Sequence, residues 1–380
     1  MWLEDGHPHF FLVNYLRVSF ADRSVVEKDF LRHNLLVLAM SIASSLSLHL
    51  GTLLVLLLSL LATPALSAFI PAPAFVSFTT TTTTTTNHHR QTTVPLSMKD
   101  STKAGLRGQT VFLTGATGGL GQALALQLAQ ADVGALILSA RKPEALQRLT
   151  DAVHALNDKL VVHQVVCDLA DAAQVQKVAK QLTHEYGTID CLINNGGVSS
   201  RSSFLETDLG VDEKIMQINF LSGCAFAKAL IPGMVAQKSG RVIWISSVQG
   251  LVGIPNRSSY AASKFAVQGY TESIRAELQA DGVTVHTVSP GYIRTNLSQS
   301  ALTGDGSAYG TTDATTAAGA DPTSVATDLL DRIVTRNEVD FTIAATPSAV
   351  AAVYLRTLCP GLLRYLLVKR FAKSRKEKTE

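Results

Sequence analysis

Short apolar runs alternate with longer, helix-length segments from about residue 108 to residue 346. Each run is rich in Val, Ile and Leu and ends near glycine, serine or asparagine, which is typical of buried strands in a parallel sheet. The runs are TVFLTG, ALILSA, LVVHQVVCDL, IDCLINN, RVIWISS and VTVHTVSP. Segments between them, such as GQALALQLAQ, have the length of a helix. Repeated strand and helix units predict an α/β fold with a doubly wound parallel sheet in a single catalytic domain.

Residues 35–70 break this pattern, because they form one long apolar stretch. They comprise 36 positions without a single Lys, Arg, Asp or Glu, which is enough to cross a bilayer. Pro64 and the small residues of ATPALSA resemble the end of a signal peptide and its cleavage site. We interpret the stretch as a signal peptide or an uncleaved membrane anchor, preceded by an extension over residues 1–34.

Residues 71–107 have a third kind of composition. The junction AFIPAPAF leads into a threonine run at 79–86, and the stretch up to about residue 98 has Arg90 but no acidic residue. This is the composition of a plastid transit peptide. The junction also resembles the alanine-phenylalanine junction of two-part plastid presequences in algae with secondary plastids. A linker between an anchor and a domain explains the composition equally well.

Charge is concentrated at the C-terminal end of the chain. The net charge is +3, and the last twelve residues, KRFAKSRKEKTE, hold six Lys or Arg against two Glu. The rest of the chain is close to neutral and has no basic stripe with interleaved aromatic residues, so no nucleic-acid partner is expected. Residues 347–380 are predicted to form a helix with a basic tail, which packs on the domain or contacts a membrane.

The composition also limits the role of the cysteines. Hydrophobic residues make up 46% of the chain, which is ample for a full core. The four cysteines form no CxxC pair and no cluster with histidine at metal-ligand spacing. We therefore expect no metal site and interpret them as small buried hydrophobic residues. They are Cys167, Cys191, Cys224 and Cys359.

The first candidate for chemistry is the glycine-rich turn TGATGGLG, residues 114–121, which follows the first apolar run and opens a helical segment. Glycines there let the backbone approach a pyrophosphate, and the helix N-terminus offers N–H donors and a positive dipole end. The strand, turn and helix context strengthens a motif that alone is weak. A Rossmann-type dinucleotide-binding fold is predicted, with cofactor contacts from Gly115, Thr117, Gly119, Leu120 and Gly121.

The second candidate is the segment YAASK. If it is helical, Tyr260 and Lys264 lie on one face and point into one site. The pair alone is weak, because this spacing arises by chance in many chains of this length. Its context is stronger: Ser247 lies thirteen residues upstream of the tyrosine, Asn219 lies in the earlier segment INFLSG, and PGYIRT follows at residues 290–295.

Taken in order, these motifs resemble the classical short-chain dehydrogenase/reductase family over about residues 108–370. The turn matches that family's TGxxxGxG, and NNGG at residues 194–197 is similar to its NNAG, with glycine in place of alanine. The serine-to-tyrosine spacing and the stretch PGxxxT match as well. Gly118 also fits the TGxxGxxG turn of the extended branch, whose members epimerise or dehydrate nucleotide sugars, but the later motifs favour the classical branch.

The resemblance implies a catalytic set of Asn219, Ser247, Tyr260 and Lys264. Reduction of a carbonyl needs hydride at carbon and a proton donor at oxygen, where negative charge develops. Tyr260 would donate the proton, and the cation of Lys264 would lower its pKa from about 10 towards working pH. Ser247 would orient the carbonyl, and Asn219 would hold a water that relays protons from Lys264 to solvent.

Cofactor preference is expected from SARKPEA, which follows the second strand. A carboxylate there hydrogen-bonds the adenosine ribose and selects NAD, whereas an arginine accommodates a 2′-phosphate. Ala140 stands at the carboxylate position and Arg141 follows it, so NADP(H) is predicted. The resemblance adds cofactor contacts from Asp168, Leu169, Asn195, Gly197, Tyr260, Lys264, Ile293 and Thr295.

The predicted function is an NADP-dependent oxidoreductase that interconverts a carbonyl and a secondary alcohol on a hydrophobic, lipid-derived substrate. Residues 296–320, which are rich in Gly, Ser, Thr and Ala, are predicted to form a mobile substrate lid. Asp321 and Pro322 are predicted to begin the next helix. Two alternatives stay open, a non-catalytic NADP-binding or interaction protein and a nucleotide-sugar epimerase.

Three further stretches indicate where the protein resides. SPGYIRTNLS, DGSAYG and VYLRTLCPGLL resemble a subgroup of the family whose members carry an N-terminal membrane anchor. We therefore expect membrane association, placement in the endoplasmic reticulum membrane, and a homodimer. The transit-like composition of residues 71–107 leaves a plastid as the alternative compartment.

Cleavage of the apolar stretch can be tested directly. If residues 35–70 are a signal peptide, N-terminal sequencing of the mature protein should begin near Phe69, because signal peptidase cuts after small residues. A sequence that begins at Met1 or Met40 contradicts cleavage and indicates an anchor.

Overall fold

The computed structural model describes residues 98–379 of the chain, with side chains to residue 372. Residues 98–353 lie within one compact unit, and residues 354–370 belong to a second. The N-terminal extension, the apolar stretch and the transit-like region up to residue 97 lie outside the described residues, and so do the predictions made for them.

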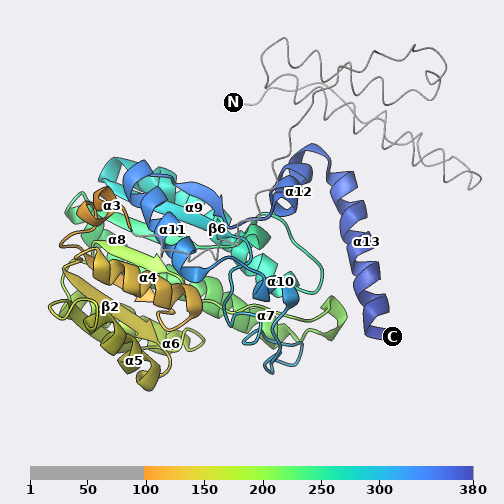
Figure 1. Ribbon diagram of the computed structural model, residues 1–380, viewed down its shortest axis with the longest axis horizontal. Helices are drawn as coiled ribbons and strands as arrows, with labels where there is room; N and C mark the ends of the chain where they lie inside the picture. Colours follow the sequence, from red (N-terminus) through yellow and green to blue (C-terminus); the bar gives the residue numbers. More distant parts are fainter. Residues whose placement is uncertain (1–97, 380) are drawn as a thin grey trace, which may run out of the picture. The chain divides into compact units, whose positions relative to one another are not determined.

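Strands and helices alternate along the first unit (Figure 1). The strands are β1 (Thr110–Thr114), β2 (Ala135–Ala140), β3 (Val161–Val166), β4 (Cys191–Asn194), β5 (Gly240–Ile245), β6 (Val283–Pro290) and β7 (Asp340–Ile343). The helices of both units within the described residues are α3 (Asp100–Ala104), α4 (Gly119–Gln130), α5 (Pro143–His154), α6 (Ala172–Glu185), α7 (Leu209–Met216), α8 (Ser222–Ala236), α9 (Ser258–Leu278), α10 (Ala314–Ala317), α11 (Pro322–Arg336), α12 (Pro347–Leu358) and α13 (Pro360–Thr379). Shorter turns are η2 (Phe204–Glu206), η3 (Gln217–Leu221), η4 (Val248–Gly250) and η5 (Gln279–Asp281).

The strands form one parallel sheet in the order β3-β2-β1-β4-β5-β6-β7. β1 pairs with β2 on one side and with β4 on the other, so the chain winds outward to β3 and then returns past β1. Open α/β sheets bind ligands outside the carboxyl ends of the strands at such a switch point. The predicted doubly wound, Rossmann-type fold is confirmed.

Each face of the sheet has its own hydrophobic core, because successive side chains of a strand point to opposite faces. Val111 and Leu113 belong to the core beneath α4, α5 and α11, whereas Phe112 between them belongs to the core beneath α6, α8 and α9. α4 and α11 lie side by side over the first face (Figure 1). The result is a three-layer arrangement that leaves the strand ends open.

Most local predictions for this unit are confirmed. The six predicted runs form β1 to β6, and the Asp321 side chain caps α11 by accepting a hydrogen bond from the Ser324 N–H at 3.0 Å. Cys167, Cys191 and Cys224 are buried, as expected for small hydrophobic residues, and so is Cys359 in the second unit. β7 was missed, because its sequence, DFTI, is only four residues long and gains its order from pairing with β6.

One continuous helix in the described residues, Leu209–Ala236, is long and apolar enough to cross a membrane by length and composition. It comprises α7, the π-helical turn η3 and α8. Its apolar side chains Phe226, Leu230 and Met234 pack in the core against the sheet. Packing within this unit therefore accounts for its composition.

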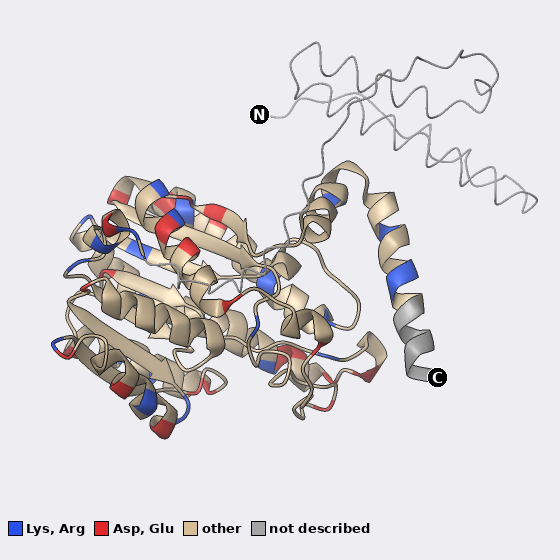
Figure 2. Cartoon of the chain, in the orientation of Figure 1, with Lys and Arg blue, Asp and Glu red and all other residues tan. Residues whose placement is uncertain are grey.

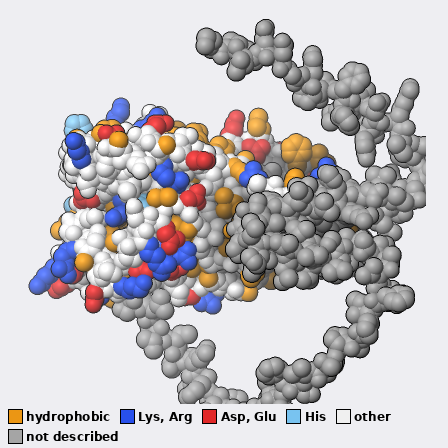
Figure 3. All heavy atoms as spheres, turned by 90° about the horizontal axis from the view of Figure 1, so that it is seen from above, with side chains coloured by type: hydrophobic (Ala, Val, Ile, Leu, Met, Phe, Trp, Pro, Cys, Tyr) orange, Lys and Arg blue, Asp and Glu red, His pale blue; other side chains and the backbone are white. Residues whose placement is uncertain are grey.

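Acidic and basic side chains are interspersed over the helices of the first unit (Figure 2). The view from above shows the same mixture on the part of the surface drawn in colour, with apolar side chains scattered between the charges (Figure 3). Mixed signs cancel at a distance in salt solution, so these faces produce no extended field of one sign.

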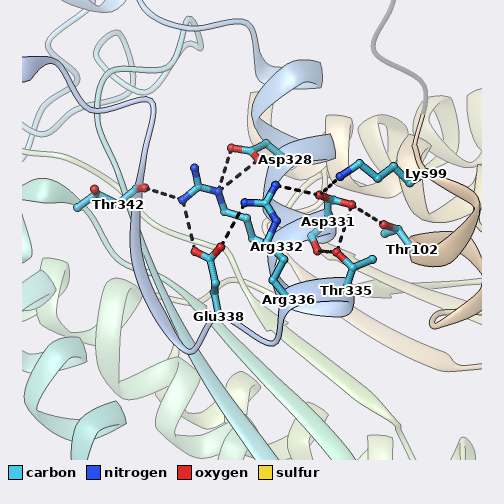
Figure 4. A network of polar contacts seen from close by, with 9 residues as sticks. All are labelled: Lys99, Thr102, Asp328, Asp331, Arg332, Thr335, Arg336, Glu338 and Thr342. Carbon is cyan, nitrogen blue, oxygen red and sulfur yellow. Dashed lines mark hydrogen bonds and ion pairs between the residues drawn. The ribbon is translucent and has the colours of Figure 1, made fainter.

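Residues 98–107 pack on the first unit as well. Met98 and Leu106 are part of the core beneath α11, and the short helix α3 lies between them. Asp331 on α11 accepts hydrogen bonds from Lys99 Nζ at 2.7 Å and Thr102 Oγ1 at 2.9 Å (Figure 4). The sequence did not indicate this contact, because its partners lie more than two hundred residues apart.

The same network continues along α11 towards β7 (Figure 4). Arg332 pairs with Asp328 and Glu338 and donates to the Thr342 carbonyl. Burial alone would raise the pKa of Asp331, but the hydrogen bonds from Lys99 and Thr102 outweigh it and hold the pKa below its ordinary value. The ionised carboxylate is therefore the form that joins the start of the domain to α11.

Asp331→Asn should reduce the free energy of unfolding by about 2 kcal/mol, because it removes a buried charged acceptor of several hydrogen bonds. The folded-state pKa of Asp331 is lowered, so this stabilisation is complete above the unfolded-state pKa and is lost as pH falls through the folded-state pKa. Urea denaturation at neutral and acidic pH measures both effects. Asp328→Asn is the control, because that more exposed carboxylate should contribute less than about 1 kcal/mol. Equal losses in the two variants would contradict the assignment.

Candidate active site

A cavity of about 490 Å³ lies at the carboxyl ends of the strands. Its walls come from the turn after β1, the ends of β2, β5 and β6, and the loops after β3 and β4. All of the predicted cofactor contacts line it, from Gly115 to Thr295, and so does Ser247. Asn219 is buried behind the wall. The fold thus brings together residues that the sequence separates by as many as 180 positions.

Close backbone packing shapes the glycine-rich turn. Gly115 has a φ of +60°, and a Cβ there would lie 2.6 Å from the Gly196 Cα. A Cβ on Gly121 would overlap the Gly115 carbonyl oxygen, and one on Gly119 would lie 2.5 Å from Thr295 Cγ2. Without those side chains the N-terminus of α4, whose first N–H groups have no partner inside a helix, faces the cavity.

Hydrogen bonds lock this turn to the loop after β4. Thr114 Oγ1 accepts the N–H groups of Asn195 and Gly196 at 3.1 and 3.0 Å. The Asn195 amide in turn donates to the carbonyls of Thr114 and Gly115, at 3.1 Å each. Asn195 lines the cavity, but its side-chain donors are used to fix the turn.

One end of the cavity is bounded by β2 and by the loop after β3. Ala140 is buried and Arg141 beside it is exposed, so the guanidinium is free to reach a group at the cavity edge. Asp168 is held by its own loop, since its N–H donates to Gln174 Oε1 at 2.6 Å and its carboxylate accepts from the Ala170 N–H. Burial raises the pKa of the neighbouring Cys167 to about 12, which keeps that thiol neutral.

The other end of the cavity holds Ser247, Tyr260 and Lys264, all of them buried. α9 places the tyrosine and the lysine one turn apart, and the lysine Nζ donates to the Ile245 carbonyl at 2.8 Å. Ser247 follows β5 and hydrogen-bonds the Tyr260 hydroxyl. Its Oγ also accepts the Gln249 N–H at 3.1 Å, so the hydroxyl group has a fixed place at the end of the strand.

Burial and neighbouring groups shift the pKa of Tyr260 in opposite directions. Burial raises the pKa of Tyr260 most strongly, and the hydrogen bond from Ser247 and the charges of Arg201 and Arg257 lower it only in part. Burial lowers the pKa of Lys264 itself to about 8. Lys264 Nζ nevertheless lies 5.8 Å from the centre of the Tyr260 ring, and the lowering of the tyrosine pKa by this cation stays a prediction.

Asn219 lies in the π-helical turn η3, a local distortion that is frequent at functional sites. Its amide donates to the Val198 carbonyl and to Ser263 Oγ, at 2.9 Å each, and its Oδ1 accepts the Val198 N–H at 2.8 Å. Both amide hydrogens are thereby used, and one acceptor position of Oδ1 remains. A Cβ on Gly197 would lie 3.3 Å from that oxygen and 3.5 Å from Lys264 Nζ. Asn219 Oδ1 and Lys264 Nζ therefore both lie close to Gly197.

Some residues of the site had no signal in the sequence. Val198, Leu297 and Leu302 add apolar walls to the cavity, and only their positions after NNGG and PGYIRT could have indicated them. The predicted lid has defined pairing, because Leu302 bridges both Ser200 and Ala308. Between residues 98 and 379, no group of three or more His, Cys, Asp or Glu side chains is placed to hold a metal ion.

A doubly wound sheet with a glycine-lined cavity at its switch point defines a dinucleotide-binding α/β protein. Residues 109–305 match the family model described as short chain dehydrogenase, and the chain belongs to the short-chain dehydrogenase/reductase family of oxidoreductases. It is similar to dehydrogenase/reductase SDR family member 7B of Bos taurus, with 40% identity over 280 residues, 73% of this chain and 85% of that protein. The resemblance drawn from the motifs is confirmed.

Solved structures give the same fold. A short-chain dehydrogenase from Sphingobium yanoikuyae in complex with NADPH is 25% identical, with a TM-score of 0.56 over 67% of this chain and 95% of that one. A family member from Burkholderia phymatum in complex with NAD is 22% identical, with a TM-score of 0.57 over 66% and 94%. The two structures hold different nicotinamide cofactors, so the likeness of fold alone does not select between them.

Proposed function

We propose that this protein is an NADP-dependent oxidoreductase that interconverts a carbonyl and a secondary alcohol, with Tyr260 as general acid and base. One observation carries the proposal: the buried Tyr260 hydroxyl, hydrogen-bonded to Ser247, lies in the same cavity as the glycine-rich turn. A proton donor and a dinucleotide site within one cavity are what hydride transfer to a carbonyl requires.

The cavity fits a dinucleotide. The positions of Gly119 and Gly121 exclude a Cβ by contact with Thr295 and with the turn itself, and this leaves backbone N–H groups at the start of α4 to hold a pyrophosphate. Asp168 and Leu169 bound the adenine end, and Ile293 and Thr295 bound the nicotinamide end. When bound, NADPH supplies the hydride that reduces the carbonyl carbon.

The buried polar residues supply the proton chemistry. Tyr260 donates its proton to the carbonyl oxygen during reduction, and Ser247, which already bonds the tyrosine hydroxyl, orients that oxygen. Lys264 would hold the nicotinamide ribose and would return a proton to Tyr260. Asn219 supports the relay, since its remaining acceptor position lies beside the lysine ammonium and can hold a water.

NADP is the proposed cofactor because of Arg141. The guanidinium is exposed at the cavity edge directly after β2, where a 2′-phosphate would lie. The position that would carry a ribose-binding carboxylate is the small residue Ala140. NADPH in the related Sphingobium yanoikuyae enzyme is consistent with this choice.

The proposed substrate is hydrophobic. Val198, Leu297 and Leu302 give the end of the cavity beyond Ser247 an apolar wall. A lipid-derived substrate in the endoplasmic reticulum membrane rests on the apolar stretch at residues 35–70 and on the likeness to member 7B. A plastid, indicated by the composition of residues 71–107, is the alternative compartment.

Two alternative functions would require different residues or a different cofactor behaviour. A non-catalytic NADP-binding protein has no need for the buried set of Asn219, Ser247, Tyr260 and Lys264. A nucleotide-sugar epimerase would retain NAD tightly and show no net cofactor turnover, so the identity of a dinucleotide that copurifies with the protein distinguishes it from the proposed reductase.

Tyr260→Phe should lower the rate of NADPH oxidation with a carbonyl substrate by about 10²–10⁴-fold, because it removes the general acid. NADPH binding, followed by cofactor fluorescence, should persist, since the phenyl ring remains. The control is Tyr186→Phe, because Tyr186 packs on His163 and does not line the cavity. A Tyr260→Phe enzyme that keeps the wild-type rate rules out the proposed mechanism.

Arg141→Ala should raise KM for NADPH about tenfold or more and leave KM for NADH unchanged, because it removes a charge-assisted contact with the 2′-phosphate. Ala140→Asp should do the opposite and favour NADH. Steady-state kinetics with both cofactors measure the ratio. Arg148→Ala, an exposed arginine on the nearby helix α5, is the control. A wild-type enzyme that prefers NADH would overturn the cofactor assignment.

A further inference from the structure

A largely buried ion-pair cluster joins three segments of the first unit. Asp313 Oδ2 accepts hydrogen bonds from Nε and Nη2 of Arg201, at 2.8 and 2.6 Å, and from Nη2 of Arg257, at 3.0 Å. Each arginine side chain is 11% exposed and the aspartate is 17% exposed. Three charged groups are thus largely removed from water at one point.

The three residues come from three separate segments. Arg201 lies in the loop after β4, Arg257 stands at the N-terminus of α9 three residues before Tyr260, and Asp313 lies on the lid directly before α10. The lid also pairs with the β4 loop through its backbone, because the Leu302 carbonyl accepts the Arg201 N–H at 2.8 Å. The cluster therefore adds a side-chain link between the lid and the helix that carries Tyr260.

The cluster depends on all three charges. Two guanidiniums share one carboxylate, and a buried charge that loses its partner is strongly unfavourable. Arg201 is oriented further by Nη1, which donates to Ser199 Oγ and the Ser200 carbonyl at 2.7 Å each. Two arginines and one aspartate leave the cluster with a net positive charge, and this charge acts on Tyr260. Burial raises the pKa of Tyr260 most, and Arg201 and Arg257 oppose that rise together with Ser247.

We propose that Arg201, Asp313 and Arg257 are positioning residues, which hold the lid against the start of α9 and keep two guanidinium groups near Tyr260. The inference rests on the proposed function, because it assigns the cluster to the same reaction. In this arrangement the lid carboxylate sets the position of both arginines, so closure of the lid and the electrostatic environment of Tyr260 are coupled.

Limited digestion with chymotrypsin tests the link without catalysis, because Leu297, Leu302 and Tyr309 on the lid are sites for this protease. Cleavage within residues 296–320 should be about tenfold faster or more in Asp313→Asn and in Arg257→Gln, since each change breaks a buried ion pair. Arg257→Lys keeps the charge and can replace the single donor to Asp313, so it should be cleaved at close to the wild-type rate.

Asp305→Asn is the matched control on the same lid. Asp305 is exposed and accepts hydrogen bonds from Thr303 and Ser307 within the lid itself, so its cleavage rate should equal that of the wild type. NADPH binding, measured by fluorescence, should persist in all of these variants, because none of the changed residues lines the cofactor cavity.

The kinetic readout separates this inference from the proposed function. On a carbonyl that the wild type reduces, Asp313→Asn and Arg257→Gln should raise KM or lower kcat, and Arg257→Lys should restore both. If the wild type reduces no carbonyl, the proposed function fails while digestion still tests the link. If chymotrypsin cleaves the lid of both Asp313→Asn and Arg257→Gln at the wild-type rate, the inference is overturned. The inference is also overturned if Arg257→Lys is digested as fast as Arg257→Gln. If Asp313→Asn does not fold, the comparison of these two Arg257 variants is the test of the inference.

Discussion

The contact between the turn after β1 and the loop after β4 is the constraint on which the site depends. Thr114 and Asn195 exchange hydrogen bonds across it, and Gly115 and Gly196 approach so closely that a Cβ would not fit. Because this contact lies at the switch point of the sheet, it fixes the N-terminus of α4 relative to Gly197 and the residues behind it. A looser contact would separate the dinucleotide end of the cavity from the tyrosine end.

Burial makes Tyr260 harder to ionise, and the surrounding positive charges partly offset this effect. A buried tyrosine resists ionisation and a buried lysine resists protonation, and both shifts are present here. A Lys264 with a pKa of about 8 exchanges its proton more easily near neutral pH than a free lysine does. The charges of Arg201 and Arg257 act against burial at Tyr260, because they lower the pKa that burial raises.

The local motifs were readable from the sequence because each one lies within a single strand, turn or helix. The glycine-rich turn, the Tyr260 and Lys264 pair and the Asp321 cap depend on neighbours a few residues away, and local geometry decides them. Contacts over long separations were not readable. Arg201 and Asp313 lie 112 positions apart, and Lys99 and Asp331 lie 232 apart. No periodicity or composition marks such pairs, since each partner alone resembles an ordinary surface charge.

α9 unites these features, because its first turns serve the reaction and the same turns hold it to the sheet. Ser263 bonds both the Tyr260 carbonyl and Asn219, and Ser246 after β5 donates to the Lys264 carbonyl. One turn further on, Gln268 donates to Ser246 and to Ser289 at the end of β6. The tyrosine is therefore held from the sheet, from the π-helical turn and, through Arg257, from the lid. A displacement of the lid would reach the tyrosine through the N-terminal end of this helix, because Arg257 at that end donates to Asp313 on the lid.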